Sequence, residues 1–400
     1  MSISNSVLEM HPTVTTWRRD IHAHPETAFE EHRTSDFVAS KLEEFGIEVH
    51  RGIGKTGLVG VLKAGSGDKK IGLRADMDAL FIKEENEFEH CSKIEGKMHA
   101  CGHDGHTAIL LGAAKELAET KNFNGTVFFI FQPAEETGNE LCGGSAMIKD
   151  GLFERFPADC IFALHNFPSL PLGQVAVRKG PMLASVDTFE VKITSEHTHA
   201  YGQHLTPDPL LTAAKLVESF HALKARYIDP ADNVILTITQ FQAGDPINDE
   251  PGVHVGPSEA LFRGTIYTLN EAIRDDIQAQ LGKLVKGIAS TYDAGYKFDY
   301  QRGYPVMVNS PAETEFAVKV AQSVVGVDNV EPDMKPIMGA EDFSFMLREK
   351  PGCYIALGTA GDEPGVLPCQ LHNPHYDFND KVIPQGVQYF VNLANRYLTD

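Results

Sequence analysis

Short apolar segments alternate with helical segments along the first 170 residues, and this alternation is the strongest constraint on the fold. Apolar runs typical of buried strands occur at residues 58–64, 71–75, 126–131 and 160–164. A helical stripe over residues 30–45 ends at Gly46, and the Ala- and Leu-rich segment 106–119 indicates a second helix. This alternation predicts a parallel or mixed sheet that helices cover on both faces, with ligands bound beyond the carboxyl ends of its strands.

The pattern changes near Ser185. Strand and helix patterns then follow in the order strand 186–193, helix 208–226, strand 234–241, strand 259–269, helix 270–292 and strand 296–300. The order β-α-β-β-α-β is typical of a compact α+β sandwich. We therefore expect an α/β protein whose catalytic domain is discontinuous, at residues 1–184 and 304–400. A smaller α+β domain at residues 185–303 is expected to interrupt it.

The charge balance narrows the choice of partners. The 400-residue chain has 35 Lys and Arg against 55 Asp and Glu, a formal net charge of −20. Because nucleic acids and anionic membranes are bound by clustered Lys and Arg, we expect neither as a partner. No apolar run approaches the roughly 18 residues of a membrane span, and no signal peptide is evident. Six cysteines do not make a disulfide scaffold, so a cytoplasmic location is expected.

Two polar clusters occur where strands end or a helix begins. Cys101 and His103 are two residues apart at a helix entrance, and thiolate and imidazole are ligands that suit Zn, Co or Mn. Glu135 and Glu136 follow the strand at 126–131, where one carboxylate can bind a metal while its neighbour accepts a proton. The alternatives are a buried cysteine with solvated histidines and a pair of surface glutamates.

Three further polar groups could likewise belong to a functional site or be ordinary structural residues. They are Arg74 with Asp76 and Asp78, His165 at the end of another apolar run, and His372 near the C-terminus. A salt bridge from Arg74 to Asp76 or Asp78, or a buried histidine, explains each group taken alone. Because the carboxyl ends of neighbouring strands meet at one rim of the sheet, the groups together predict one common site.

Seven segments resemble, in order, the signature segments of the metal-dependent amidohydrolases. They are RRDIHAHPE, LRADMDAL, MHACGHDGHTA, FQPAEE, ALHNFP, MGAEDFS and LHNPHYDFND, which extend from about residue 16 to residue 380. That family includes hippurate hydrolases, aminoacylases and plant hydrolases of indole-acetyl–amino-acid conjugates. The resemblance implies a zinc-peptidase-like catalytic domain and an inserted lid domain that commonly dimerises. We therefore expect a homodimer or tetramer formed through the lid.

The resemblance also implies a binuclear site with two divalent metal ions per chain, of Mn, Zn, Co or Ni. Its five ligands are Cys101, His103, Glu136, His165 and His372. Glu135 takes the general-base position, so that metal-bound hydroxide would attack the amide carbonyl of a small N-acyl compound. His199 corresponds to the lid histidine of the family, which would stabilise the developing oxyanion from its own chain or from a partner subunit.

The chain departs from the family in its lid and substrate residues. The glycines that precede the lid histidine are replaced by residues 195–198. An Asn and an Arg that hold the α-carboxylate of the substrate are replaced by His254 and Tyr267, and Asn248 is a candidate substitute. Glu341, from MGAEDFS, completes the expected substrate-binding residues. Without the Arg, bidentate recognition of a carboxylate is expected to weaken.

Other functions fit parts of the same pattern. A dipeptidase or carboxypeptidase would use the same scaffold. A thiol hydrolase would use Cys101 as nucleophile, His103 or His165 as base and Glu135 to orient the base. A non-catalytic binding protein would lack a ligand or the base, yet all six positions are filled.

Overall fold

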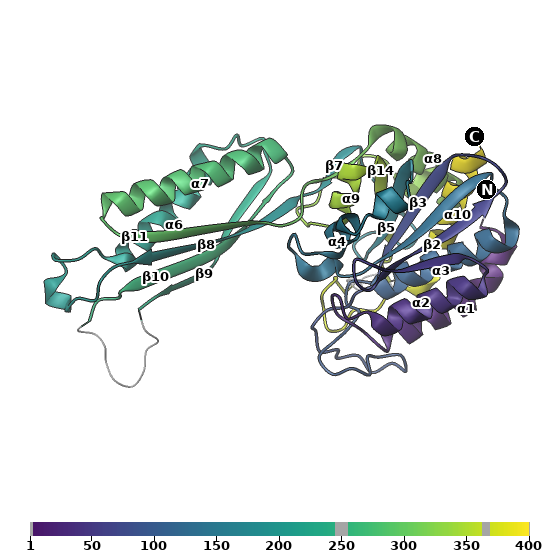
Figure 1. The fold of residues 1–400 in the computed structure, drawn as a ribbon, viewed down its shortest axis with the longest axis horizontal. Coiled ribbons are helices and arrows are strands. Elements are labelled where there is room, and N and C mark those ends of the chain that lie inside the picture. The colour runs from purple at the N-terminus through teal and green to yellow at the C-terminus, as the bar shows by residue number, and fades with distance from the viewer. Residues whose placement is uncertain (1–2, 245–254, 362–368, 400) are drawn as a thin grey trace. The chain divides into compact units, whose positions relative to one another are not determined.

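The computed structural model describes residues 3–244, 255–361 and 369–399, and the chain forms two compact units (Figure 1). The first unit comprises Met1–Met182, Met307–Lys335 and Glu341–Asp400, and the second comprises Leu183–Val306 and Pro336–Ala340. The sequence placed the inserted part at residues 185–303. The short segment Pro336–Ala340 joins the second unit because Ala184 N donates a hydrogen bond of 2.8 Å to the carbonyl oxygen of Gly339.

Over its described residues, the first unit is built on an eight-stranded sheet. In spatial order its strands are β1 (Glu48–Ile53), β2 (Gly57–Ala64), β4 (Gly125–Gln132), β3 (Lys70–Asp76), β5 (Cys160–Phe167), β14 (Gly352–Gly358), β6 (Val175–Ala176) and β13 (Val330–Glu331). The central strands β4, β3, β5 and β14 are parallel, and β1 and β2 pair antiparallel with their neighbours. β6 is antiparallel to β14 and parallel to β13. The predicted mixed sheet is therefore confirmed.

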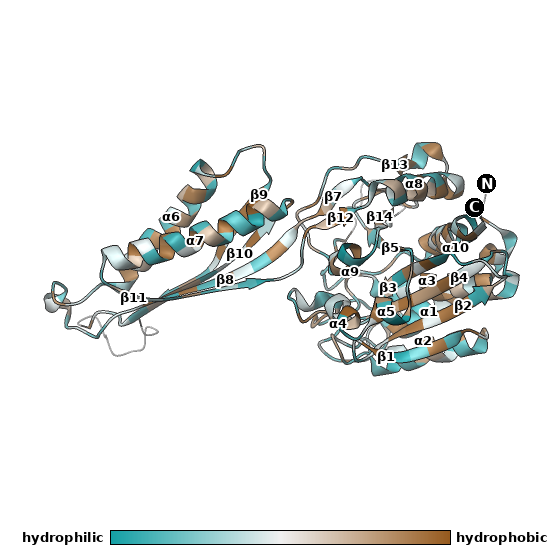
Figure 2. Ribbon diagram, turned by 45° about the horizontal axis from the view of Figure 1, so that its top comes forward, coloured by the Kyte–Doolittle hydropathy of each residue, from teal (hydrophilic) through white to brown (hydrophobic). Residues whose placement is uncertain are grey.

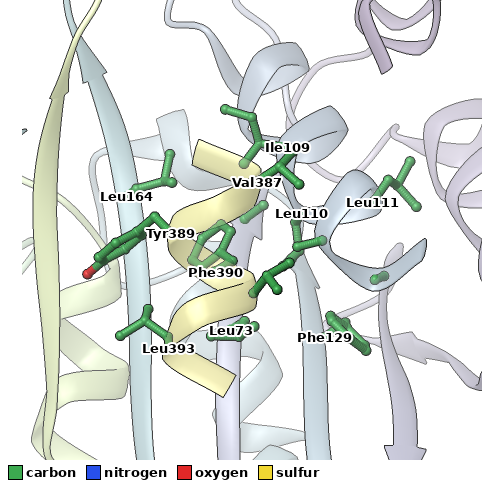
Figure 3. Close-up of a cluster of buried hydrophobic side chains, with 14 of the residues drawn as sticks. Leu73, Ile109, Leu110, Leu111, Phe129, Leu164, Val387, Tyr389, Phe390 and Leu393 are labelled. Carbon is green, nitrogen blue, oxygen red and sulfur yellow. The ribbon is translucent and has the colours of Figure 1, made fainter. Parts of the chain in front are cut away.

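Helices cover both faces of this sheet. They are α1 (Asn5–His22), α2 (His32–Glu44), α3 (His103–Thr120), α4 (Gly143–Lys149), α5 (Leu152–Arg155), α8 (Pro311–Val325), α9 (Phe343–Glu349) and α10 (Ile383–Thr399). Side chains of β3 alternate between the two faces. Leu73 packs with Phe129 and with buried residues of α3 and α10 (Figure 3). The next residue, Arg74, points to the opposite face and bonds Asp342, which precedes α9.

The second unit has the predicted element order. It consists of β8 (Ser185–Thr194), α6 (Pro209–Arg226), β9 (Val234–Ala243), β10 (Glu259–Thr268), α7 (Glu271–Thr291) and β11 (Gly295–Arg302). The sheet has the order β11-β8-β10-β9 and is antiparallel. Hydrophobic and hydrophilic residues alternate along α7 (Figure 2), and the helix buries Ile277, Leu281 and Val285, which are spaced four residues apart.

Two further strands pair with each other, β7 (Gly180–Leu183) and β12 (Met307–Asn309). No helix among the described residues is both long enough and apolar enough to cross a membrane.

Candidate metal centre

The five expected metal ligands lie on four segments of the first unit. Glu136 is in a 3-10 turn directly after β4, His165 is near the carboxyl end of β5, Cys101 and His103 are at the start of α3, and His372 is in the segment between β14 and α10. Because β4 and β5 are both parallel to β3, their carboxyl ends meet at one edge of the sheet. The ligand candidates gather at this edge, as expected for a mixed α/β sheet.

Two unusual backbone conformations bring the segments together. Gly102 has φ 95°, and a Cβ atom there would lie 2.2 Å from Oδ1 of Asn166, so that only glycine fits between Cys101 and His103. His372 is a non-glycine residue with φ 62°, and its backbone N–H donates to the carbonyl oxygen of Ala100 at 2.8 Å. A left-handed histidine costs about 1–3 kcal/mol and persists only where surrounding contacts hold it.

Within the described part of the chain, two groups of donor atoms consist entirely of the five ligand candidates. Cys101, His103 and His165 offer donor atoms within 4.8 Å of one another, and so do Cys101, Glu136 and His372. His165 Nε2 lies 3.4 Å from Cys101 Sγ, and His372 Nε2 lies 3.2 Å from Glu136 Oε1. Cys101 belongs to both groups, so its sulfur lies at their junction.

Hydrogen bonds on the far side of two histidines fix which ring nitrogen faces the site. His103 Nδ1 donates to the carbonyl oxygen of Asp78 at 2.9 Å, and His165 Nδ1 donates to that of Asn166 at 2.8 Å. Since a carbonyl oxygen only accepts, each Nδ1 carries a proton and each Nε2 is directed toward the other donors. Asp78 also accepts from the backbone N–H of Glu136 at 2.9 Å, so it positions two of the five candidates.

The chemistry of this donor set fits a bound cation. His103 Nε2 is buried and has no hydrogen-bond partner among the described residues, and carboxylate oxygens of Asp76 and Glu136 lie 3.8 and 3.9 Å away. Burial opposes a charge on His103, but the Asp76 and Asp78 carboxylates outweigh burial and raise its pKa to about 10. The surroundings therefore favour positive charge at this point, which a metal ion supplies when the imidazole is its ligand.

Glu135, the expected general base, lies beside the ligand candidates. It is 7% exposed, and one of its carboxylate oxygens lies within 4.8 Å of the donor atoms of His103 and Glu136. Burial, together with the nearby charges of Glu341 and Glu136, raises the pKa of Glu135 well above its usual value. A carboxyl group with a raised pKa is a stronger base near neutral pH.

Glu341, expected in the substrate site, belongs to a buried polar network behind Glu135. One of its oxygens accepts from Arg74 Nη2 and the other from the Tyr354 hydroxyl, both at 2.9 Å. Arg74 also donates to Asp76 at 2.7 Å, which is one of the two salt bridges that the sequence left open. Glu341 is 3% exposed, and each of its carboxylate oxygens already accepts a hydrogen bond from the protein.

His106 has a structural role that was not predicted from the sequence. Its Nδ1 lies 2.6 Å from Asp76 Oδ1 and its Nε2 lies 2.6 Å from Asn166 Oδ1, so the ring joins the ends of β3 and β5. The signal available in the sequence was its membership of the histidine-rich segment that includes His103. The bonds of Asp78 and His106 join segments that are distant in the sequence, and for this reason the local pattern gave no indication of them.

The remaining expected residues belong to the second unit. His199 is exposed, precedes a 3-10 turn, and its Nδ1 accepts from the backbone N–H of Tyr201 at 3.4 Å. Tyr267 is half-buried on β10, opposite Val186 of β8. Asn248 and His254 lie outside the described residues.

Comparison with known proteins identifies the family. The model of peptidase family M20/M25/M40 matches residues 72–396. A hippurate hydrolase from Campylobacter jejuni is 38% identical over 398 residues, which cover 100% of both chains. The thermostable carboxypeptidase 2 of Saccharolobus solfataricus is 34% identical over 99% of this chain and 98% of its own length.

A solved structure agrees with these relatives. A Bacillus subtilis protein described as a dinuclear metal-binding peptidase of the M20 family is 31% identical and has a TM-score of 0.81, over 98% of this chain and 99% of that chain. The family match covers most of the chain, and the sequence relatives align along nearly the whole of it. The chain therefore belongs to peptidase family M20/M25/M40 and is a hydrolase of amide bonds.

Proposed function

We propose that this hydrolase uses two divalent metal ions to cleave the amide bond of an N-acyl amino acid or a related conjugate. The observation that carries the proposal is that two groups of donor atoms share the sulfur of Cys101. The ligand residues would be Cys101, His103, Glu136, His165 and His372, with the Cys101 thiolate contributing to both ions. Thiolate, imidazole and carboxylate together suit Zn, Co, Ni or Mn.

Glu135 is proposed to move the proton. Bound divalent ions would supply Lewis-acid chemistry, which polarises a carbonyl and lowers the pKa of water toward neutral pH. A carboxylate oxygen of Glu135 accepts a proton from water and holds it until the nitrogen of the leaving amine takes it. Its raised pKa supports this role, because a carboxyl group of ordinary pKa binds a proton only weakly at pH 7.

The alternative of a thiol hydrolase is disfavoured by the surroundings of Cys101. Burial and the Glu136 and Glu135 carboxylates raise the pKa of this thiol well above its usual value. A nucleophilic cysteine needs the opposite, a site that lowers the pKa and exposes the thiolate. A cation between these groups reverses the preference, which is the behaviour expected of a ligand.

The substrate class is inferred from the relatives and from two arginines. The hippurate hydrolase relative supports an N-acyl amino acid, and the carboxypeptidase relative supports a peptide as the second candidate. Arg263 and Arg302 are the first candidates to replace the missing Arg, but they pair with Glu190 and Asp275, each at 2.6 Å. We therefore propose that a free carboxylate on the substrate is recognised only weakly.

Two expectations from the sequence complete the proposal. His199 would donate a hydrogen bond to the developing oxyanion, acting from its own chain or from a second one. The chain would form a homodimer or tetramer through the second unit, and light scattering of the purified protein tests this directly.

The proposal is tested with a substrate panel and defined metals. Metal-free protein should be inactive, and Mn, Co, Zn or Ni should restore turnover of N-acetyl or N-benzoyl amino acids. Dipeptides in the same panel measure the second candidate. Turnover that survives EDTA and is abolished by iodoacetamide would instead support a thiol hydrolase.

A further inference from the structure

A buried arginine of the first helix joins two segments that carry ligand candidates, although it lies outside the metal centre. Arg18 of α1 is fully buried. Its Nε and Nη2 donate to the two carboxylate oxygens of Asp380 at 2.8 and 3.0 Å. Its Nη1 donates to Asp377 at 2.8 Å and, more weakly, to Asp104 at 3.4 Å. Asp104 directly follows His103, so this guanidinium connects the start of α3 with the segment before α10.

The segment that Arg18 holds includes the most exposed of the five ligand candidates. The side chain of His372 is 51% exposed, compared with 12% for Glu136. His372 also has the left-handed backbone, with φ 62°, that requires support from its surroundings. Asp377 and Asp380 follow it by five and eight residues, and they anchor the segment through Arg18.

The segment with His103 has a different main support. His22, one turn after Arg18 on α1, contacts Asp104 with its Nδ1 at 2.8 Å, and its Nε2 lies 3.2 Å from Glu84. The bond from Arg18 to Asp104 is longer, at 3.4 Å. Arg18 therefore holds mainly Asp377 and Asp380, whereas His22 is the principal partner of Asp104.

We propose that Arg18 is a positioning residue for His372. The inference rests on the proposed function, because it assumes that Cys101, Glu136 and His372 hold one of two ions. Without the guanidinium, Asp380 keeps its half-exposed partner Arg19 and Asp377 keeps His90, but both lose their fully buried cation, and the segment that orients His372 loosens. The group of Cys101, His103 and His165 keeps its own support. One ion is then held at least tenfold more weakly, since loss of a partner that orients a ligand typically costs 10- to 100-fold in metal affinity.

The test is a titration of the metal-free, full-length chain with Co²⁺, followed by calorimetry and by the thiolate-to-cobalt absorption band of Cys101. Wild type should bind two ions. Arg18→Gln should bind one ion as tightly as wild type and the second at least tenfold more weakly. Arg18→Lys should recover part of the loss, because an ammonium keeps the charge but not the forked bonds. His22→Gln should weaken the other ion.

A matched control separates positioning from loss of stability. Val14 is fully buried on the same helix and takes no part in the hydrogen bonds of Arg18 to Asp377, Asp380 and Asp104, so Val14→Ala lowers the melting temperature while every donor and acceptor of those bonds is kept. This variant should bind both ions as wild type does. If it loses the second ion as Arg18→Gln does, the effect is destabilisation and the positioning role is rejected.

The remaining outcomes distinguish the inference from the proposed function. Two tightly bound ions in Arg18→Gln would overturn the inference and leave the two-ion hydrolase intact. If Arg18→Gln does not fold, unchanged binding of the second ion by Arg18→Lys overturns it equally. A wild-type chain that binds one ion or none would refute the two-ion site itself.

Discussion

Replacement of Glu135 by Gln separates proton transfer from metal binding and from folding. The amide keeps the shape of the side chain but does not accept the proton, and general-base catalysis contributes about 10²- to 10⁴-fold. We therefore expect kcat to fall by that factor, about 3–5 kcal/mol in barrier height. The fold should not suffer, because Glu135 shares its buried surroundings with Glu341 and Asp342. The carboxylate oxygens of this group lie within 4.8 Å of one another, and two like charges at that separation repel by about 3 kcal/mol at an effective dielectric constant of about 20, a repulsion that the neutral amide does not make.

The assay combines three measurements on Glu135→Gln and wild type. Steady-state kinetics on an N-acyl amino acid give kcat, elemental analysis gives the metal content, and thermal unfolding of the metal-free protein gives stability. The expected result is a large loss of kcat with both ions retained and a melting temperature equal to or above that of wild type. Turnover near the wild-type value would assign the base to another residue. A lowered melting temperature would show that the Glu135 carboxylate stabilises the buried network.

Three further predictions concern the ions, the second unit and the substrate. His165→Ala should lower metal affinity or activity at least tenfold, and EDTA should abolish turnover; elemental analysis without any transition metal would refute both. His199→Ala should lower kcat far more than metal content, with His197→Ala nearly neutral, and the reverse order would shift the assigned register of this segment by two residues. With Tyr267 in place of the missing Arg, the carboxamide of an N-acyl amino acid should reach kcat/KM within about tenfold of the free acid. A preference for the acid above about a hundredfold would show that another cation binds the carboxylate, and Arg263 and Arg302 would be mutated first.

Hydrophobic periodicity predicted the elements in which buried residues follow a regular pattern along the sequence. β3 and β4 are buried along nearly their whole length, and α7 has one apolar stripe, so each stands out in the sequence. The residue pattern of α1 did not indicate a helix. Its buried face includes Arg18 and His22 among the apolar residues, and Pro12 lies inside the helix, so the stripe is interrupted. The edge strand β1 was missed for a related reason, since most of its residues are exposed or half-buried.

The candidate site was predictable in part. The ends of apolar strands pointed to a common edge of the sheet, and the structure places Cys101, Glu136 and His165 together there. Each residue taken alone also had an ordinary structural explanation. The resemblance to the family was needed to predict that these residues are metal ligands. The role of Asp78 was not predictable, because it depends on bonds to His103 and to the backbone of Glu136, and these form only when separate segments meet.

The bond between Arg18 and Asp380 joins residues 362 positions apart, which sets the order of events during synthesis. At about 5–20 residues per second, roughly 20 to 70 seconds separate the appearance of the two residues at the ribosome. Until the chain has been synthesised as far as Asp380, Arg18 of α1 lacks its principal partners, and His372 is absent for nearly all of this time. The first unit therefore completes its core and its metal centre only after the second unit has been synthesised. Release of the chain before this point would leave the first unit without a complete core and without its metal centre.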